Sequence, residues 1–265
     1  MHPTKYHKPS SVSDAVAALA GADDGKLLAG GQTLLPTMKQ HLAAPSDLVD
    51  VRSIDGMSEI TVGNGTVTVG AATTHAEVAA SAEVRQHIPG LASLAGGIGD
   101  PAVRHMGTIG GSLANNDPAA DYPAAVLGLG ASVITSKREI AADDFFDGMF
   151  TTALEDDEII TAVRFPVPEA SAYAKFDNPA SRYAMAGVFV SRGASGVRVA
   201  VTGAGDDGVM RHDGLEAALS SSFTADACDG VEVSADGLLS DIHASAAYRA
   251  NLVKQMAKTA VAAAG

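Results

Sequence analysis

Two short glycine-rich segments constrain this chain more than any other feature. The first, Ala29-Gly30-Gly31-Gln32-Thr33-Leu34, follows a predicted strand and opens a predicted helix. The second, Thr108-Ile109-Gly110-Gly111-Ser112, ends a glycine-rich stretch that begins at Leu91. Glycine gives the backbone access to positive φ and lets peptide N–H groups approach a phosphate closely. Two such segments suit a diphosphate better than one does.

Each glycine pair also has a purely structural interpretation, and the residues alone leave both open. The first pair fits a tight strand-to-helix turn, and the second pair would let two elements pack closely. Two carboxylates follow the second pair, Asp117 and Asp121. They offer acceptors for ribose or ring N–H groups, or they cap helices beginning at Pro118 and Tyr122.

A third glycine pattern is deceptive. Gly203-Ala204-Gly205-Asp206-Asp207-Gly208 follows a predicted strand and matches the G-x-G-x-x-G pattern of a dinucleotide-binding turn. Two carboxylates inside the loop would repel a pyrophosphate, and residues 209–213 do not continue as an amphipathic helix. We therefore interpret the segment as a surface loop.

Composition narrows the function classes. The 265 residues include 18 basic and 31 acidic side chains, a formal charge of −13, which argues against binding nucleic acid or anionic membranes. The single Cys228 forms no intramolecular disulfide, and the N-terminal residues lack the apolar stretch of a signal peptide, so we expect a cytoplasmic protein. No window approaches the roughly 18 consecutive apolar residues of a membrane span.

The sequence contains no motif that indicates a metal site or a catalytic nucleophile. The eight histidines form no His-x-x-x-His pair, and one cysteine cannot hold a zinc or iron–sulfur site, so we expect no metal centre in this chain. Cys228 has acidic neighbours that raise its pKa, and no G-x-S-x-G motif is present. His75 and His105 are interpreted as helix or loop residues, not general bases. We nominate no catalytic residue.

The length of 265 residues suggests about two domains, although a single larger α/β or α+β domain would also fit. In the first part, helices are predicted at 12–20 and 34–42, and strands at 26–29 and 47–51 form a parallel βαβ layer. A hairpin turn at 63–65 and a capping box of Thr74 and Glu77 before a helix reaching Ala80 follow. The stretch from 91 to 111 is too irregular for one element and is predicted to be a functional loop or a tightly packed crossing. A helix at 123–129 and strands at 132–135 and 159–165 come next.

Pro166-Val167-Pro168 is predicted to be a domain boundary. Beyond it, strands at 172–176, 185–190 and 197–202 indicate an antiparallel meander, and helices near 215–219 and 245–263 would cover one face. The predicted domains are therefore 1–166 and 167–265.

The two glycine segments in this order resemble the FAD-binding medium subunit of the molybdenum hydroxylases, the family of aerobic carbon monoxide dehydrogenase and bacterial xanthine dehydrogenase. The residues that carry the resemblance are Ala29 to Thr33 and the run from Asp100 to Ala124, and it extends from Tyr6-His7-Lys8-Pro9 to Tyr248-Arg249. The chain departs from the family pattern at Thr33, commonly Ser, and at Ser112, commonly Asn.

The resemblance implies an α+β fold, with a PCMH-type FAD-binding domain of two subdomains, about 1–55 and 56–166. It is followed by a carbon monoxide dehydrogenase flavoprotein-type C-terminal domain, a small antiparallel sheet with helices. It also implies that the two glycine segments hold the FAD diphosphate, largely through backbone N–H groups. The implied cofactor-binding residues are Ala29, Gly30, Gly31, Gln32, Thr33, Leu34, Ile98, Thr108, Ile109, Gly110, Gly111, Ser112, Asn115, Asp117, Asp121, Ile160 and Lys175.

The same resemblance implies an electron-transfer subunit. A large subunit would hold the molybdenum cofactor and oxidise the substrate, a small subunit would hold [2Fe-2S] clusters, and electrons would pass through FAD on this chain to NAD or another acceptor. The expected assembly is a dimer of heterotrimers. The alternatives are a stand-alone FAD-dependent oxidase or reductase of the same superfamily, and an assembly subunit without flavin.

Overall fold

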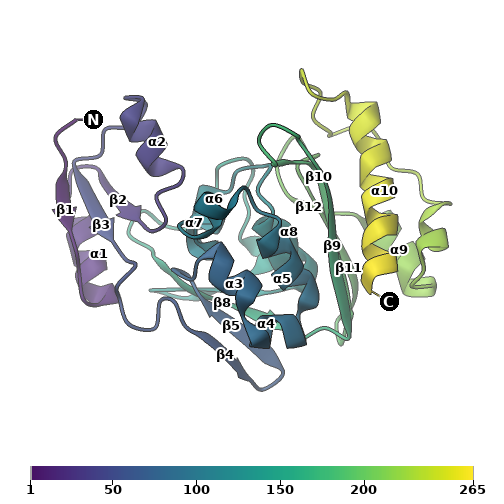
Figure 1. The fold of residues 1–265 in the computed structure, drawn as a ribbon, viewed down its shortest axis with the longest axis horizontal. Helices are drawn as coiled ribbons and strands as arrows, with labels where there is room; N and C mark the ends of the chain where they lie inside the picture. The colour runs from purple at the N-terminus through teal and green to yellow at the C-terminus, as the bar shows by residue number, and fades with distance from the viewer. Residues whose placement is uncertain (1, 265) are drawn as a thin grey trace.

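The computed structural model describes residues 2–264 and confirms the α+β class (Figure 1). The N-terminal layer is a small parallel sheet in the strand order β1-β3-β2. Its elements are β1 (Lys5–His7), α1 (Val12–Ala20), β2 (Gly25–Leu28), α2 (Leu34–Lys39) and β3 (Asp47–Asp50). The predicted parallel pairing of the second and third of these strands is confirmed, and β1 adds a strand that the hydrophobic pattern did not predict.

The middle of the chain forms a five-stranded antiparallel sheet in the order β4-β5-β8-β6-β7. Its strands are β4 (Ile60–Gly63), β5 (Thr66–Gly70), β6 (Ser132–Thr135), β7 (Glu139–Ala141) and β8 (Ile160–Pro166). The predicted β4–β5 hairpin is present, and Asn64 and Gly65 both take positive φ, as a two-residue type I′ turn requires. Val69, Val163 and Val133 face one another across three strands and are fully buried.

Six short helices accompany this sheet (Figure 1). They are α3 (His75–Ala80), α4 (Ala82–His87), α5 (Pro89–Gly96), α6 (Pro101–Arg104), α7 (Ile109–Asn115) and α8 (Tyr122–Leu129), and a 3-10 turn, η1 (Ala142–Asp144), follows β7. The predicted capping box at the start of α3 is confirmed: the Thr74 hydroxyl accepts from Glu77 N, and the Glu77 carboxylate accepts from Thr74 N.

The C-terminal region is the predicted antiparallel meander with helices. Its elements are β9 (Ala170–Asp177), β10 (Ala184–Gly193), β11 (Gly196–Thr202), β12 (Met210–Arg211), α9 (Asp213–Ser221), η2 (Ala225–Cys228) and α10 (Ala246–Ala264). Helix α10 covers one face of the sheet, and α8 packs on the other (Figure 1). Residues 184–191 of β10 are consequently all buried, as expected for a strand covered on both faces. No helix within residues 2–264 is both long and apolar enough to cross a membrane.

The stretch from 91 to 111 differs from its prediction. It is not one element, as expected, but most of it is helical rather than looped: it contains most of α5, all of α6 and the start of α7. Glycine is needed where this stretch lies against other backbone: a Cβ at Gly110 would stand 2.7 Å from Ala71 O. Helix α2 is also shorter than predicted, because the chain turns at His41, which takes φ +62°.

Candidate functional site

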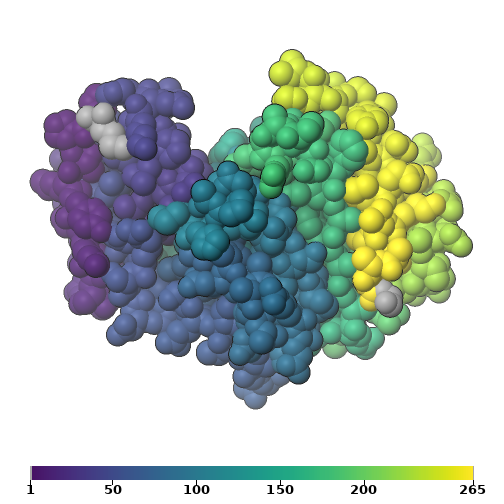
Figure 2. All heavy atoms as spheres, in the orientation of Figure 1, coloured from purple at the N-terminus to yellow at the C-terminus, as the bar shows by residue number. Residues whose placement is uncertain are grey.

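A cavity of about 720 Å³ opens between the N-terminal layer and the rest of the molecule, where Figure 2 shows the surface hollowed. Its walls come from the β2–α2 turn, the α5–α7 region, the segment 154–160 and the turn 181–183. The volume falls in the range of roughly 300–1,000 Å³ that is typical of small-molecule sites. Residues that are distant in sequence thus form one concave surface.

Nearly all the residues expected from the sequence meet in this cavity. Those that line it are Ala29, Gly30, Gly31, Gln32, Thr33, Leu34, Ile98, Thr108, Gly110, Gly111, Ser112, Asn115, Asp117, Asp121 and Ile160. Two do not. Ile109 is fully buried in the hydrophobic core, and Lys175 stands behind Asp121. The other fifteen predicted residues therefore lie around one cavity, whereas Ile109 and Lys175 lie outside its lining.

Gly30 allows the two glycine segments to approach each other. A Cβ at this position would lie 2.1 Å from Met106 O and 2.6 Å from Gly107 Cα, distances that real Cβ atoms do not reach. The neighbouring Gly31 takes φ +67°, a conformation that other residues rarely adopt. The first pair thus makes a tight turn and also lets the turn lie directly against residues 106–107.

The first segment carries the free backbone donors. Gly31 O accepts from Leu35 N at 3.1 Å and Thr33 O accepts from Thr37 N at 3.2 Å, so these carbonyls are committed to helix α2. In contrast, the backbone N–H groups of residues 30–34 have no hydrogen-bond partner among the described residues. A run of unpaired N–H groups on a cavity wall supplies hydrogen-bond donors of the kind that anions accept.

The second segment differs from the expectation, because its backbone donors are already used within the chain. Ile109 N donates to Thr73 O at 3.1 Å, and Gly110 N donates to Ala71 O at 2.8 Å. Gly111 N donates to the Thr108 hydroxyl at 3.2 Å. These three backbone N–H groups are therefore not free to bind a diphosphate, which differs from the expectation for the second segment.

The two glycines of the second segment have different roles. A Cβ at Gly110 would lie 2.6 Å from Ala71 Cβ and 2.7 Å from Ala71 O, so Gly110 serves close packing. A Cβ at Gly111 would meet only Thr108 Oγ1 at 3.0 Å and Ala29 Cβ at 4.0 Å, and Gly111 is exposed. The structural interpretation holds for Gly110, whereas Gly111 leaves room on the cavity side.

Asp121 brings a buried carboxylate to the cavity wall. It is 5% exposed, accepts a hydrogen bond from the Tyr173 hydroxyl at 2.6 Å, and lies 3.0 Å from Lys175 Nζ. Burial raises the pKa of the Asp121 carboxyl, and the Lys175 ammonium opposes that rise. The Asp121 side chain does not cap α8, so the capping interpretation is wrong for this residue. Asp117 accepts from Ala119 N, a local turn bond.

Lys175 links β9 to the cavity wall. Its ammonium donates to Gly97 O and to Arg182 O, both at 3.0 Å, in addition to pairing with Asp121. Arg182 takes φ +63° and donates to Gly99 O at 3.2 Å. These bonds fix the turn 181–183 over the cavity, next to Ile98.

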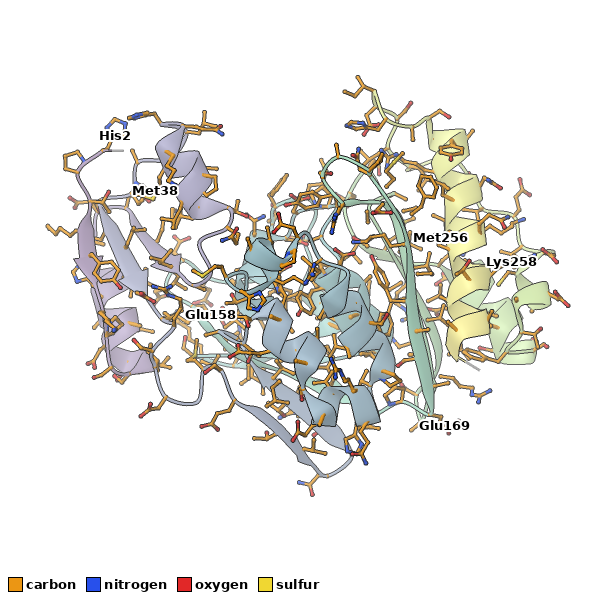
Figure 3. The ribbon with its side chains drawn as sticks, in the orientation of Figure 1. His2, Met38, Glu158, Glu169, Met256 and Lys258 are labelled. Atoms are coloured by element: carbon orange, nitrogen blue, oxygen red, sulfur yellow. The ribbon has the colours of Figure 1, made fainter. Side chains whose placement is uncertain are left out.

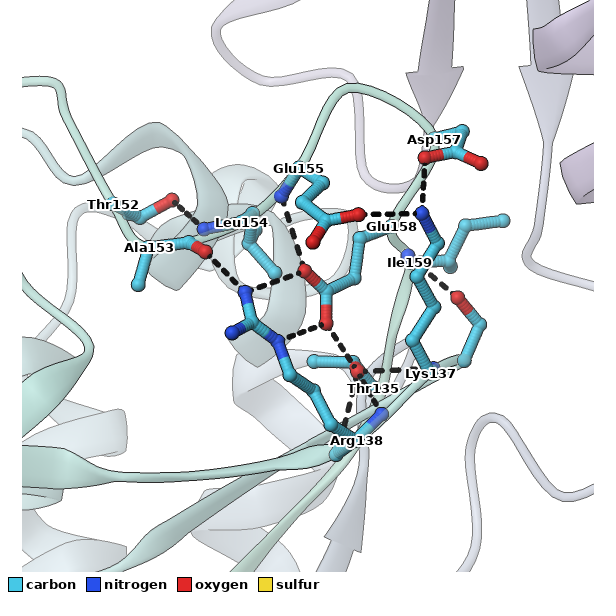
Figure 4. Close-up of polar contacts among 11 residues, drawn as sticks. Thr135, Lys137, Arg138, Thr152, Ala153, Leu154, Glu155, Asp157, Glu158 and Ile159 are labelled. Atoms are coloured by element: carbon cyan, nitrogen blue, oxygen red, sulfur yellow. Dashed lines mark hydrogen bonds and ion pairs between the residues drawn. The ribbon is translucent and has the colours of Figure 1, made fainter.

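A buried ionic network holds the opposite wall, at the position of Glu158 in Figure 3. The Glu158 side chain is fully buried and accepts from Arg138 Nε at 3.0 Å, Arg138 Nη2 at 3.1 Å, the Thr135 hydroxyl at 2.7 Å and Glu155 N at 3.0 Å (Figure 4). The hydrogen bonds from Arg138 lower the pKa of Glu158 to about 2. Glu158 therefore stays ionised and fixes the segment that carries Ile159 and Ile160 into the cavity.

Several lining residues were not predicted from the sequence. They include His75, Asp156, Glu158, Arg182 and Tyr183. The sequence Ser181-Arg182-Tyr183 is part of the family resemblance, which could have indicated two of them. For His75, Asp156 and Glu158 no local pattern marks the position, because the cavity is assembled from separate segments.

The third glycine pattern lies away from this cavity. Gly203 is buried, and a Cβ there would lie 2.3 Å from Ala184 O, while Asp206 and Asp207 are exposed. The segment leads into β12 and not into a helix. It is a loop with a buried base and an acidic, exposed tip, so the prediction of a surface loop is correct only for its tip.

Comparison with known proteins identifies the class. Residues 2–168 match the family model described as the FAD binding domain in molybdopterin dehydrogenase, and the chain belongs to this family of FAD-binding medium subunits of the molybdenum hydroxylases, which are oxidoreductases. The family cofactor is FAD.

Individual relatives are similar over nearly their whole length. The nicotine 6-hydroxylase medium subunit of Paenarthrobacter nicotinovorans is 35% identical, over 98% of this chain and 97% of the relative. The carbon monoxide dehydrogenase medium chain of Hydrogenophaga pseudoflava is 34% identical, over 98% and 96%. A crystal structure of the Cu,Mo-CO dehydrogenase in its cyanide-inactivated form contains a chain that superimposes with a TM-score of 0.91 at 33% identity, covering 100% of this chain and 99% of that one.

Proposed function

We propose that this chain binds FAD in the cavity, with the diphosphate between the two glycine segments. The free N–H groups of residues 30–34 supply donors for the phosphate oxygens, and Gly111 leaves the space that a side chain would fill. The proposed contacts are the fifteen lining residues named above, while Ile109 and Lys175 support the wall. The unpaired donors of the first segment are the single observation that carries this proposal.

The charges around the cavity fit a dianion held by peptide dipoles. The lining residues include the cations Lys26 and Arg182, but also the acids Asp117, Asp121, Asp156 and Glu158. Basic side chains therefore do not outnumber acidic ones at the site, in a chain whose formal charge is −13. Backbone N–H groups are the remaining source of positive potential, which explains why the glycine segment is required.

The chain would serve as an electron relay within a larger complex. FAD, when bound, exchanges electrons singly or in pairs, which suits a junction between one-electron and two-electron partners. The residues of this chain position the cofactor and close the cavity through the turn 181–183. We propose that electrons arrive from [2Fe-2S] clusters on a small subunit and leave to NAD or another acceptor. The proposed assembly is a dimer of heterotrimers.

Substrate oxidation is proposed to occur at the molybdenum cofactor of a large subunit. Two relatives of almost equal similarity carry nicotine and carbon monoxide in their names, at 35% and 34% identity. Medium subunits this alike accompany enzymes named for chemically unrelated molecules. That pattern supports a substrate choice made outside this chain.

We further propose that residues 1–166 form the FAD-binding domain, with subdomains of about 1–55 and 56–166, and that 167–265 form the C-terminal domain. Strand β8 ends at Pro166 and β9 begins at Ala170, which supports a division there. We also propose a cytoplasmic location, supported by the single cysteine, which is buried and unpaired.

The test is the flavin content of the complex purified with its partner subunits. The protein is denatured with acid, and the released flavin is separated by chromatography and quantified against this chain. We expect one FAD per chain. A complex in which this chain is intact but no flavin is released would support the flavin-free assembly subunit instead.

A further inference from the structure

His75 is a buried histidine whose side chain forms no hydrogen bond with the described residues. The residue lines the cavity but is only 5% exposed. Its Nδ1 atom is enclosed and has no partner, and no bond from Nε2 is formed within residues 2–264. An unpaired polar atom in the interior costs free energy, and Nε2, which is not enclosed, is the nitrogen whose missing partner a ligand in the cavity can supply.

The position of the ring places Nε2 next to the glycine segments. His75 begins helix α3, and its backbone N donates to Gly107 O at 2.9 Å. Its Nε2 lies 2.5 Å from where a Cβ of Gly107 would stand, and Gly107 in turn lies against Gly30. Because Nδ1 is enclosed, Nε2 is the nitrogen that faces the cavity.

The imidazole lies beside the ring of Tyr122, and its burial favours the neutral form. Its ring centroid is 5.2 Å from that of Tyr122, which is fully buried. Burial, with a contribution from Arg104, lowers the pKa of His75 to about 4. The ring is therefore neutral at pH 7, with one N–H donor and one acceptor.

We propose that His75 is a further binding residue, whose Nε2–H donates a hydrogen bond to the diphosphate of the dinucleotide in this cavity. A neutral donor suits this place, because it satisfies an anionic oxygen without the desolvation cost of a buried cation. Nε2 thereby adds a side-chain donor next to the second segment, where the three backbone donors at 109–111 are already occupied. The inference rests on the proposed FAD function.

The test compares His75→Phe with the wild type, both as the complex with partner subunits after removal of flavin. Phenylalanine keeps the ring contact with Tyr122 and removes both nitrogens. The dissociation constants of FAD and of ADP, a probe that carries the diphosphate without the flavin, are measured by calorimetry. We expect both constants to rise by about 10- to 100-fold, the loss of a hydrogen bond to a charged group. His87→Gln, at the end of α4, is the matched control and should bind both ligands as the wild type does.

A second measurement does not depend on the variant folding well. In the complex with ¹⁵N-labelled histidine, the Nε2 resonance of His75 should shift when ADP or FAD is added. Unchanged binding of FAD by His75→Phe, weakened binding of FAD but not of ADP, or a Nε2 resonance that does not move would each overturn the proposal. If the wild-type complex binds neither ligand, the proposed FAD function itself is wrong.

Discussion

Substitution of Gly111 separates cofactor binding from folding. The residue is the third of helix α7, it is exposed, and its Cβ position has open space on the cavity side. An alanine there gains about 1 kcal/mol of helix propensity over glycine. Part of that gain is offset by the 3.0 Å approach of the new Cβ to Thr108 Oγ1. We therefore expect the stability of flavin-free Gly111→Ala to change by less than about 1 kcal/mol.

Gly111→Asp adds a negative charge to the same place. At about 4 Å, two unit charges repel by about 1 kcal/mol in water and about 4 kcal/mol at the effective dielectric of a protein surface. Each 1.4 kcal/mol is a factor of about ten in affinity, so the carboxylate should weaken FAD binding by about 5- to 700-fold per phosphate charge that it approaches. Gly111→Ala should weaken binding by less, because it only fills space.

The assay pairs two readings on each complex: the visible absorption of bound flavin during a titration with FAD, and urea unfolding of the flavin-free protein. We expect Gly111→Asp to lose flavin while its unfolding midpoint stays near that of the wild type. Retention of normal flavin content by Gly111→Asp would refute the placement of the diphosphate. A loss of flavin that is matched by an equal loss of stability would show that Gly111 acts through the fold.

Three other substitutions test the framework of the site. Gly30→Ala should lower the free energy of unfolding by about 1–3 kcal/mol, the usual cost of overpacking, because its Cβ would lie 2.1 Å from backbone. A variant as stable as the wild type in urea would contradict the close approach of Gly30 to residues 106–107. Glu158→Gln should lower the free energy of unfolding by about 1.5–3 kcal/mol, the value of hydrogen bonds to a charged group. The pKa of Glu158 is lowered to about 2 in the folded protein, so its stabilisation is present above the unfolded-state pKa and is lost as the pH falls toward 2. A mutational cost that does not shrink in acid would be inconsistent with this. Lys175→Met should lower the free energy of unfolding by about 3–5 kcal/mol, because it leaves the Asp121 carboxylate buried without its cation. The double variant with Asp121→Asn should recover part of that loss. Strictly additive losses in a double-mutant cycle would show that the two side chains do not interact.

Local sequence signals predicted much of this fold correctly. The capping box at Thr74 and the Asn64-Gly65 turn depend on contacts between residues close in sequence, and both are present. The predicted parallel layer, whose two strands are joined by a single crossover, is present as well. The prediction of local structure failed for residues 91–111, where contacts between segments distant in sequence determine the backbone conformation. The glycines between 91 and 111 indicated irregular backbone, yet short helices form there, and at Gly110 the approach of Ala71 leaves no room for a side chain.

The candidate site likewise combines residues that local sequence patterns indicate with residues that only the folded chain brings together. The glycine segments are local patterns, and the sequence indicated them together with their order along the chain. That Ile109 N and Gly110 N would bond to residues 71–73 depends on a crossing of two elements more than thirty residues apart in sequence. His75 and Glu158 carry no local pattern, because their burial is produced by segments that meet only in the folded chain.

A structure of the flavin-loaded complex would show whether one FAD lies in this chain with its diphosphate between the two glycine segments. We expect phosphate oxygens within hydrogen-bond distance of the backbone N–H groups of residues 30–34, with Gly111 on the opposite side of the diphosphate. A dinucleotide bound elsewhere, or a diphosphate that makes no contact with residues 30–34, would show that the first glycine segment is not the diphosphate site.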